Sequence, residues 1–118
     1  MVTYMLPSVV IEVREYVAAD GKSPYAKWFN SLNAPAAAKI AIATTRMAQG
    51  NLSHAKSVGA GVQEYRIDFG PGYRIYFARD GDRLVILLGG GTKNRQQEDI
   101  RRAQALWADY KQRKKEEN

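Results

Sequence analysis

The side chains best suited to chemistry lie between residues 64 and 95, around two glycine-containing segments. Arginine contacts phosphate oxygens in a bidentate manner, and glycine allows a ligand to approach the backbone closely. A lysine just before a helix N-terminus is also well placed for phosphate. These features predict a surface for a phosphate-bearing ligand, and the alternative is a solvated sheet surface beside a flexible connection. The residues concerned are Glu64, Arg66, Asp68, Arg74, Tyr76 and the segment Gly89-Gly90-Gly91-Thr92-Lys93-Asn94-Arg95.

Several other kinds of site are excluded by what the sequence lacks. The glycine segment does not have the spacing of a nucleotide-binding P-loop. Without cysteine, the chain cannot form disulfides, zinc–thiolate sites or cysteine nucleophiles. The one histidine, His54, lies in a polar stretch near Lys56 and argues against a histidine-based metal site. We therefore expect neither a metal nor a small-molecule cofactor.

The residues around these side chains predict strands at 9–18, 62–69, 73–79 and 83–88, joined in part by glycine turns. If residues 70–72 form a three-residue loop, Phe69 faces Tyr73 and Arg66 faces Tyr76. Alternation across the strands then places one set of side chains in the core and the chemistry-bearing set on the other face. If that polar face is only a solvated sheet surface, we expect Arg74 to pair with Asp68 and Arg66 to pair with Glu64. The core set is Tyr65, Ile67, Phe69, Tyr73, Ile75 and Phe77.

Helix signals lie before and after the strands. Ser23-Pro24 predicts the start of a helix that extends to about Leu32, and Asn33 caps a second helix from about Pro35 to Gln49. A last helix begins at Asn94, with a frayed, charged tail at 111–118. The order β-α-α-β-β-β-α predicts an α+β fold. Its parts are an N-terminal helical hairpin, an antiparallel meander with the helices on one face, and a C-terminal helix.

The length of 118 residues predicts one domain, with a core at about 9–110. The net charge of +6 suits a polyanionic partner, either nucleic acid or an acidic protein. The N-terminus does not resemble a secretory signal, and the longest aliphatic run is too short to span a bilayer. We therefore expect a cytoplasmic protein without membrane contact.

Two segments resemble the RelE/HigB-like toxins, the addiction-module killer protein family. Residues 62–77 (VQEYRIDFGPGYRIYF) and 87–97 (LLGGGTKNRQQ) are similar to the central motifs of that family. The resemblance extends over about residues 9–110. It implies a small RelE-like fold whose exposed sheet face receives mRNA in the ribosomal A site. It also implies an antitoxin partner, commonly with a helix-turn-helix domain.

The resemblance implies a metal-independent mRNA endonuclease that inhibits translation. By motif position, Arg66, Arg74 and Lys93 are the candidate catalytic residues, and chemistry and location add Tyr76 as a proton donor. Because arginine stays protonated, the two arginines suit stabilisation of the phosphate charge and not proton abstraction. Lys93 holds an adjacent phosphate or acts as a base. The candidate RNA-binding residues are His54, Lys56 and Arg95.

Other functions fit the same residues. A ParE-like toxin shares the fold but poisons DNA gyrase, and would leave mRNA intact. A non-enzymatic nucleic-acid-binding domain is compatible with the charge, although the predicted exposed sheet face has no aromatic stripe for stacking bases. A decayed toxin would retain only antitoxin binding. An antitoxin could dock on the helical hairpin, cover the basic face or displace the last helix.

Overall fold

The computed structural model of the protein describes residues 10–117 and has the predicted α+β class. Its elements are α1 (Pro24–Asn30), α2 (Ala34–Ala48), β1 (Glu12–Glu15), β2 (Lys56–Gly59), β3 (Val62–Ile67), β4 (Tyr73–Arg79), β5 (Leu84–Thr92), a short 3-10 helix (Lys93–Arg95) and α3 (Gln96–Glu117). Of the first predicted strand, residue 9 lies outside the described residues and only Glu12–Glu15 is strand.

Side-chain caps fix where the first two helices begin. The Ser23 side chain accepts a hydrogen bond from the amide of Ala26 at 3.0 Å, and Pro24 opens α1. The Asn33 side chain accepts from the amide of Ala36 at 3.0 Å at the start of α2. Each cap satisfies an amide that has no partner within its helix. Both predicted helix starts are confirmed.

The sheet has five strands in the order β1-β5-β4-β3-β2. β2, β3, β4 and β5 form an antiparallel meander, and β1 pairs with β5 in parallel. The sheet is therefore mixed. Lys56–Gly59 lies outside the predicted strands, yet it forms a short edge strand beside β3.

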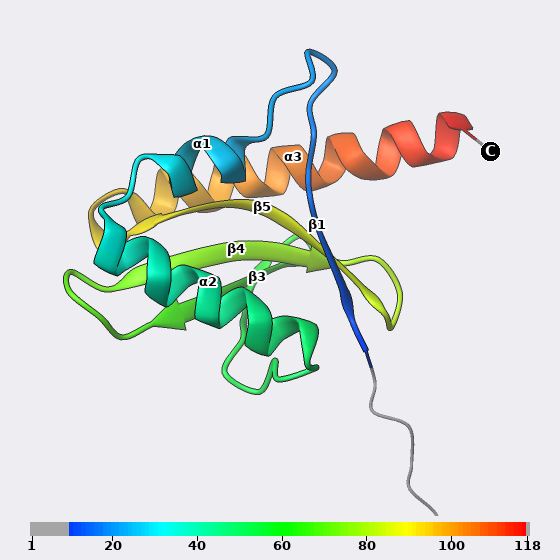
Figure 1. The fold of residues 1–118 in the computed structure, drawn as a ribbon. Helices are drawn as coiled ribbons and strands as arrows, with labels where there is room; N and C mark the ends of the chain where they lie inside the picture. Colours follow the sequence, from blue (N-terminus) through cyan, green and yellow to red (C-terminus); the bar gives the residue numbers. More distant parts are fainter. Residues whose placement is uncertain (1–9, 118) are drawn as a thin grey trace, which may run out of the picture.

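Helices cover both faces of this sheet, so the prediction that they share one face is wrong. Figure 1 shows α2 on one side of the sheet and α3 on the other. Residues of α1 and α2 pack with one core cluster, which includes Ile40, Ile75 and Phe77. Ile100 and Trp107 of α3 pack with a second cluster, which includes Tyr76. Much of the polar sheet face therefore lies beneath α3.

The β3–β4 register differs by two residues from the prediction. Ile67, not Phe69, faces Tyr73, and Arg66 faces Arg74. The connection is longer than three residues because the strands end at Ile67 and begin again at Tyr73. A shift of two residues keeps every side chain on its predicted face, since the side-chain period of a strand is two.

The glycine segment is strand and not loop, because β5 continues through Gly89, Gly90 and Gly91 to Thr92. A β-carbon at Gly90 would overlap the ring of Trp28, and one at Gly91 would overlap the carboxylate of Asp99. The glycines thus let α1 and α3 approach the two faces of β5. The predicted strand end at Leu88 is wrong, because β5 continues to Thr92.

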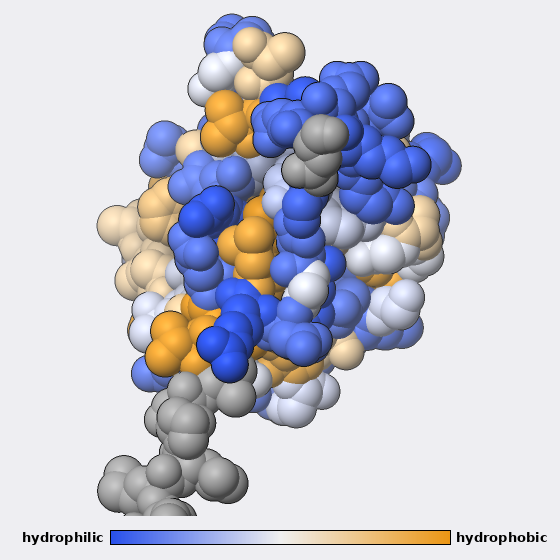
Figure 2. All heavy atoms as spheres, turned by 90° about the vertical axis from the view of Figure 1, so that its right-hand side faces the viewer, coloured by the Kyte–Doolittle hydropathy of each residue, from blue (hydrophilic) through white to orange (hydrophobic). Residues whose placement is uncertain are grey.

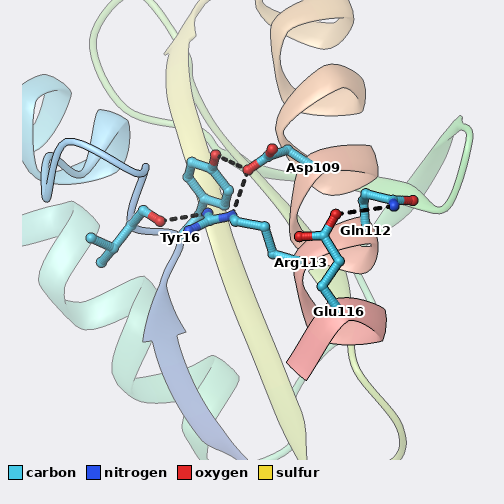
Figure 3. A network of polar contacts seen from close by, with 6 residues as sticks. Tyr16, Asp109, Gln112, Arg113 and Glu116 are labelled. Atoms are coloured by element: carbon cyan, nitrogen blue, oxygen red, sulfur yellow. Dashed lines mark hydrogen bonds and ion pairs between the residues drawn. The ribbon is translucent and has the colours of Figure 1, made fainter. Parts of the chain in front are cut away.

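α3 continues to Glu117, so the prediction that the tail from residue 111 frays is wrong for the described part. Asp109 accepts hydrogen bonds from the Tyr16 hydroxyl at 2.5 Å and from Arg113 Nε at 2.8 Å (Figure 3). Arg113 Nη2 also donates to the carbonyl of Val17 at 2.6 Å. These contacts hold the second half of α3 against the segment that follows β1.

The molecular surface is mainly hydrophilic on the side turned to the viewer in Figure 2, with a narrow hydrophobic strip between polar side chains. Among the described residues, the large hydrophobic side chains that stay exposed are Val10, Val17 and Ile42. No helix within residues 10–117 combines the length and the apolar character needed to cross a membrane.

Candidate nucleic-acid interface

A groove of about 840 Å³ brings together four of the predicted site residues. It lies beside α2, along the β3–β4 hairpin, and reaches the start of the 3-10 helix. His54, Arg66, Arg74 and Lys93 all line it. Residues distant in the sequence therefore meet on one concave surface, which we call the basic groove.

α2 adds two basic residues that sequence reasoning missed. Lys39 and Arg46 line the basic groove and are exposed. Lys39 Nζ lies 5.4 Å from the centre of the Phe69 ring, a cation–π distance. The two residues are seven positions apart, which places them on one side of a helix two turns apart. This spacing in the sequence could have indicated that Lys39 and Arg46 share one surface.

The charge of the basic groove is strongly one-sided. Its lining includes six basic side chains and one carboxylate, that of Asp68. Arg66, Lys93 and His54 are exposed, and no ion pair involves any of them among residues 10–117. The unpaired Arg66 and Lys93 are cations in a concavity, which attracts a polyanion. The arrangement is suited to a phosphate backbone.

Arg74 differs from Arg66 in its surroundings. Its side chain is 7% exposed, and Nε lies 3.3 Å from Oε1 of the buried Glu64. Gln96 donates a hydrogen bond to the other Glu64 oxygen at 2.9 Å. The expected pairing of Arg74 with Asp68 is wrong, because the observed register places Glu64 within reach and leaves Asp68 exposed in the turn.

Tyr76 does not line the basic groove. Its side chain is fully buried beneath α3, and its hydroxyl has no hydrogen-bond partner among the described residues. Burial, and then the carboxylates of Glu64 and Asp99, raise its pKa above that of an ordinary tyrosine. The role predicted for Tyr76 as a proton donor is contradicted by this burial, since a substrate cannot contact it.

Two predicted RNA-binding residues lie elsewhere. Lys56 is exposed on the edge strand β2 and is not part of the basic groove. Arg95 belongs to a second groove between α1 and α3, and its Nε lies 4.0 Å from Glu98. The predicted set is thus divided between different surfaces.

The basic groove offers charge stabilisation and limited proton transfer. Arginine guanidinium groups match the oxygens of a phosphate but do not act as bases. Histidine is the side chain best able to exchange a proton near neutral pH, and His54 is placed in the groove. Within residues 10–117 no group of three or more His, Asp or Glu residues is arranged to hold a metal ion.

Comparisons with known proteins identify the family. Residues 27–108 match the family described as Phage derived protein Gp49-like (DUF891). A relative from Haemophilus influenzae, described as an uncharacterized protein, is 45% identical over 80 residues, which is 67% of this chain and 81% of the relative. The family match covers all the residues of the basic groove. The chain belongs to the Gp49-like family, a toxin-like family of the addiction-module killer type.

Proposed function

We propose that this protein is a RelE/HigB-like toxin that cleaves mRNA on the ribosome without a metal ion. The family supports a toxin and implies a cognate antitoxin. The single observation that supports RNA as the target is the basic groove, which is lined by six basic side chains and one carboxylate. In this proposal the protein acts in the cytoplasm, where ribosomes are, and its antitoxin carries a helix-turn-helix domain.

The proposal gives the groove residues separate roles. Arg66 is exposed and contacts the scissile phosphate, where its guanidinium stabilises the charge that grows in the transition state. Lys93 holds the adjacent phosphate. Arg74 supports the groove wall, because its buried contact with Glu64 fixes its orientation. Lys39 and Arg46 attract the RNA strand along α2.

Proton transfer is assigned to His54. Cleavage by the 2′-hydroxyl needs a group that removes a proton and one that returns it to the leaving 5′-oxygen. His54 is suited to such exchange, whereas the arginines are not. A groove with one such residue is a weak catalyst by itself. Precise orientation of the RNA can supply up to about 7–11 kcal/mol, and we assign that task to the ribosome.

A defined translation reaction tests this proposal. The purified protein is added, and mRNA 5′ ends are mapped by primer extension. We expect new ends within the reading frame, and at least a tenfold lower rate for Arg66→Ala and Lys93→Ala, about 1.4 kcal/mol or more of transition-state stabilisation. Arg101→Ala is the matched control, because Arg101 is an exposed cation on α3 outside the groove.

The other outcomes identify other functions. Intact mRNA with a folded, growth-inhibiting protein would exclude the endonuclease. Double-strand DNA breaks in a parallel gyrase reaction would then assign a ParE-like activity. Circular dichroism of each variant separates loss of the site from loss of the fold.

A further inference from the structure

The outer edge of β5 is unpaired along its second half. β1 pairs with Leu84–Leu87, and the amide of Tyr16 donates to the carbonyl of Leu87 at 2.9 Å. The chain then leaves the sheet in a turn closed by a bond from the Ala18 amide to the Lys22 carbonyl at 2.8 Å. Within residues 10–117, Gly89–Thr92 pair only with β4, and Leu88 lies at the register irregularity between β4 and β5.

This free edge lies in a groove of about 1150 Å³ between α1 and α3. Figure 1 shows both helices beside the C-terminal end of β5. Trp28 forms part of one wall and Asp99 part of the other, and the edge residues 88–92 lie between them. Five extended residues span about 16 Å, enough for a short strand. We call this the edge groove, and it is distinct from the basic groove.

The edge offers backbone groups with little side-chain cover. Sheet edges are commonly protected by charged side chains, proline or a covering segment. Here three successive positions are glycine, and Gly89 and Gly90 remain partly exposed. An edge of this kind presents alternating N–H donors and C=O acceptors. That pattern matches another extended polypeptide, whereas a nucleic-acid backbone offers mainly acceptors.

The rim of the edge groove has a net positive charge. Its lining includes four cations, against the carboxylates of Asp20 and Asp99. Arg102 lies 3.8 Å from Asp99 and Arg95 lies 4.0 Å from Glu98, so these two cations are already paired, whereas Lys22 and Lys27 have no ion pair among the described residues. The cations are Lys22, Lys27, Arg95 and Arg102.

We propose that the edge groove binds an extended acidic segment of a partner protein, which adds a strand beside Leu88–Thr92. The free backbone edge supplies the ladder of hydrogen bonds, and the cations on the rim select acidic side chains. This binding does not depend on RNA cleavage, so either activity can fail without the other.

A synthetic peptide in which glutamate and valine alternate is the probe. Binding is followed by hydrogen–deuterium exchange on the full chain. We expect slower exchange at the amides of residues 88–92. A peptide with lysine in place of glutamate should bind at least tenfold more weakly. So should the acidic peptide with alternate backbone amides N-methylated, because it cannot complete the ladder.

Charge reversal tests the rim. The double variant Lys27→Glu and Arg102→Glu should weaken binding at least tenfold. The control is Arg83→Glu with Arg101→Glu, which makes the same charge change at exposed residues outside the edge groove. This control should bind like the wild type. The proposal is overturned by unchanged exchange at 88–92, by equal binding of the N-methylated peptide, or by equal weakening in the control. Equal protection by an oligoribonucleotide would assign the edge groove to nucleic acid instead.

Discussion

Arg66 and Arg74 face each other across two strands, yet their environments are opposite. Arg66 is exposed in the basic groove, whereas Arg74 is buried against Glu64. A buried ion pair that loses one member leaves an uncompensated charge, while removal of an exposed cation costs little. The same residue type is therefore free to meet a ligand at one position and is held in a structural contact at the other.

This difference predicts contrasting stabilities for two alanine variants. Arg74→Ala should lower the free energy of unfolding by about 3–5 kcal/mol, because Glu64 stays buried without its cation. Arg66→Ala should change it by about 0.5 kcal/mol or less. Urea denaturation followed by circular dichroism measures both values. Equal decreases would contradict the assigned roles.

Lys39 and Arg46 allow a test of RNA binding apart from cleavage. In the double variant Lys39→Gln and Arg46→Gln, the slope of log affinity for single-stranded RNA against log salt should become shallower. The expected change in slope is about 0.7 for each phosphate that the variant no longer neutralises. Fluorescence anisotropy over a salt series measures the slope. Arg83→Gln with Arg101→Gln is the control, and an unchanged slope in the α2 variant would remove α2 from the interface.

The sequence predicted only part of the candidate site, because some of its residues are brought together, and others are buried, by helices distant in the sequence. Arg66, Arg74 and Lys93 are candidates because their motifs resemble those of the RelE/HigB-like toxins, and the structure brings them together with His54. Lys39 was missed because a cation on a helix is typical of any solvated surface. The burial of Tyr76 was missed because it depends on α3, which is distant in the sequence.

Among the elements, β5 depends most on residues that lack side chains. Gly90→Ala would place a β-carbon within the ring of Trp28, a residue of α1 that packs against the core. We expect the free energy of unfolding to fall by about 1–3 kcal/mol, the range for overpacking. Combining it with Trp28→Leu should destabilise the protein by less than the sum of the two single effects. Additive effects would show that the two residues do not compete for space.

The β4–β5 turn and α3 are joined by Asp80. Its carboxylate accepts hydrogen bonds from Lys114 at 2.7 Å and from the Tyr110 hydroxyl at 2.6 Å. The Lys114 hydrogen bond, followed by that of Tyr110, lowers the pKa of Asp80. The pKa of Tyr110 rises to about 12 through burial first and then its bond to Asp80. We call these contacts of Asp80 with Lys114 and Tyr110 the clamp. The clamp therefore needs the charged carboxylate of Asp80 and the protonated hydroxyl of Tyr110.

Asp80 gives a prediction about pH. Because its folded pKa is lowered, its contribution is complete above the ordinary aspartate pKa of about 3.9 and is lost as the pH falls through the folded value. Asp80→Asn should cost about 1 kcal/mol at neutral pH and progressively less in acid. Urea titrations at several pH values measure the difference from the wild type. A difference independent of pH would contradict the clamp.

Local sequence signals predicted the helix starts well but missed one strand and the end of another. The caps Ser23 and Asn33 act through bonds to nearby amides, so the helix starts were readable from the sequence. β2 was not, because its four residues are mostly polar and gain their pairing from β3. The glycines of β5 look like a loop by propensity, and only the approach of Trp28 and Asp99 explains them as strand. The register error of two residues arose from the length assumed for the turn.

In the whole molecule, a single sheet carries two layers of helices and two grooves of different character. The basic groove is formed with α2 and holds the side chains expected to bind RNA. The edge groove is formed between α1 and α3 and exposes backbone. The α+β class was predictable from the order of elements. The position of α3 was not, because the polar residues Glu64 and Arg74 made its side of the sheet look solvated.

The most direct test of the central claim compares one mRNA in two states, free and on translating ribosomes, with the same amount of protein. Primer extension should show new 5′ ends within the reading frame on ribosome-bound mRNA and at least a hundredfold slower cleavage of free mRNA, since orientation supplies much of the catalysis. Equal cleavage of both would contradict ribosome dependence, and no cleavage of either would contradict the endonuclease.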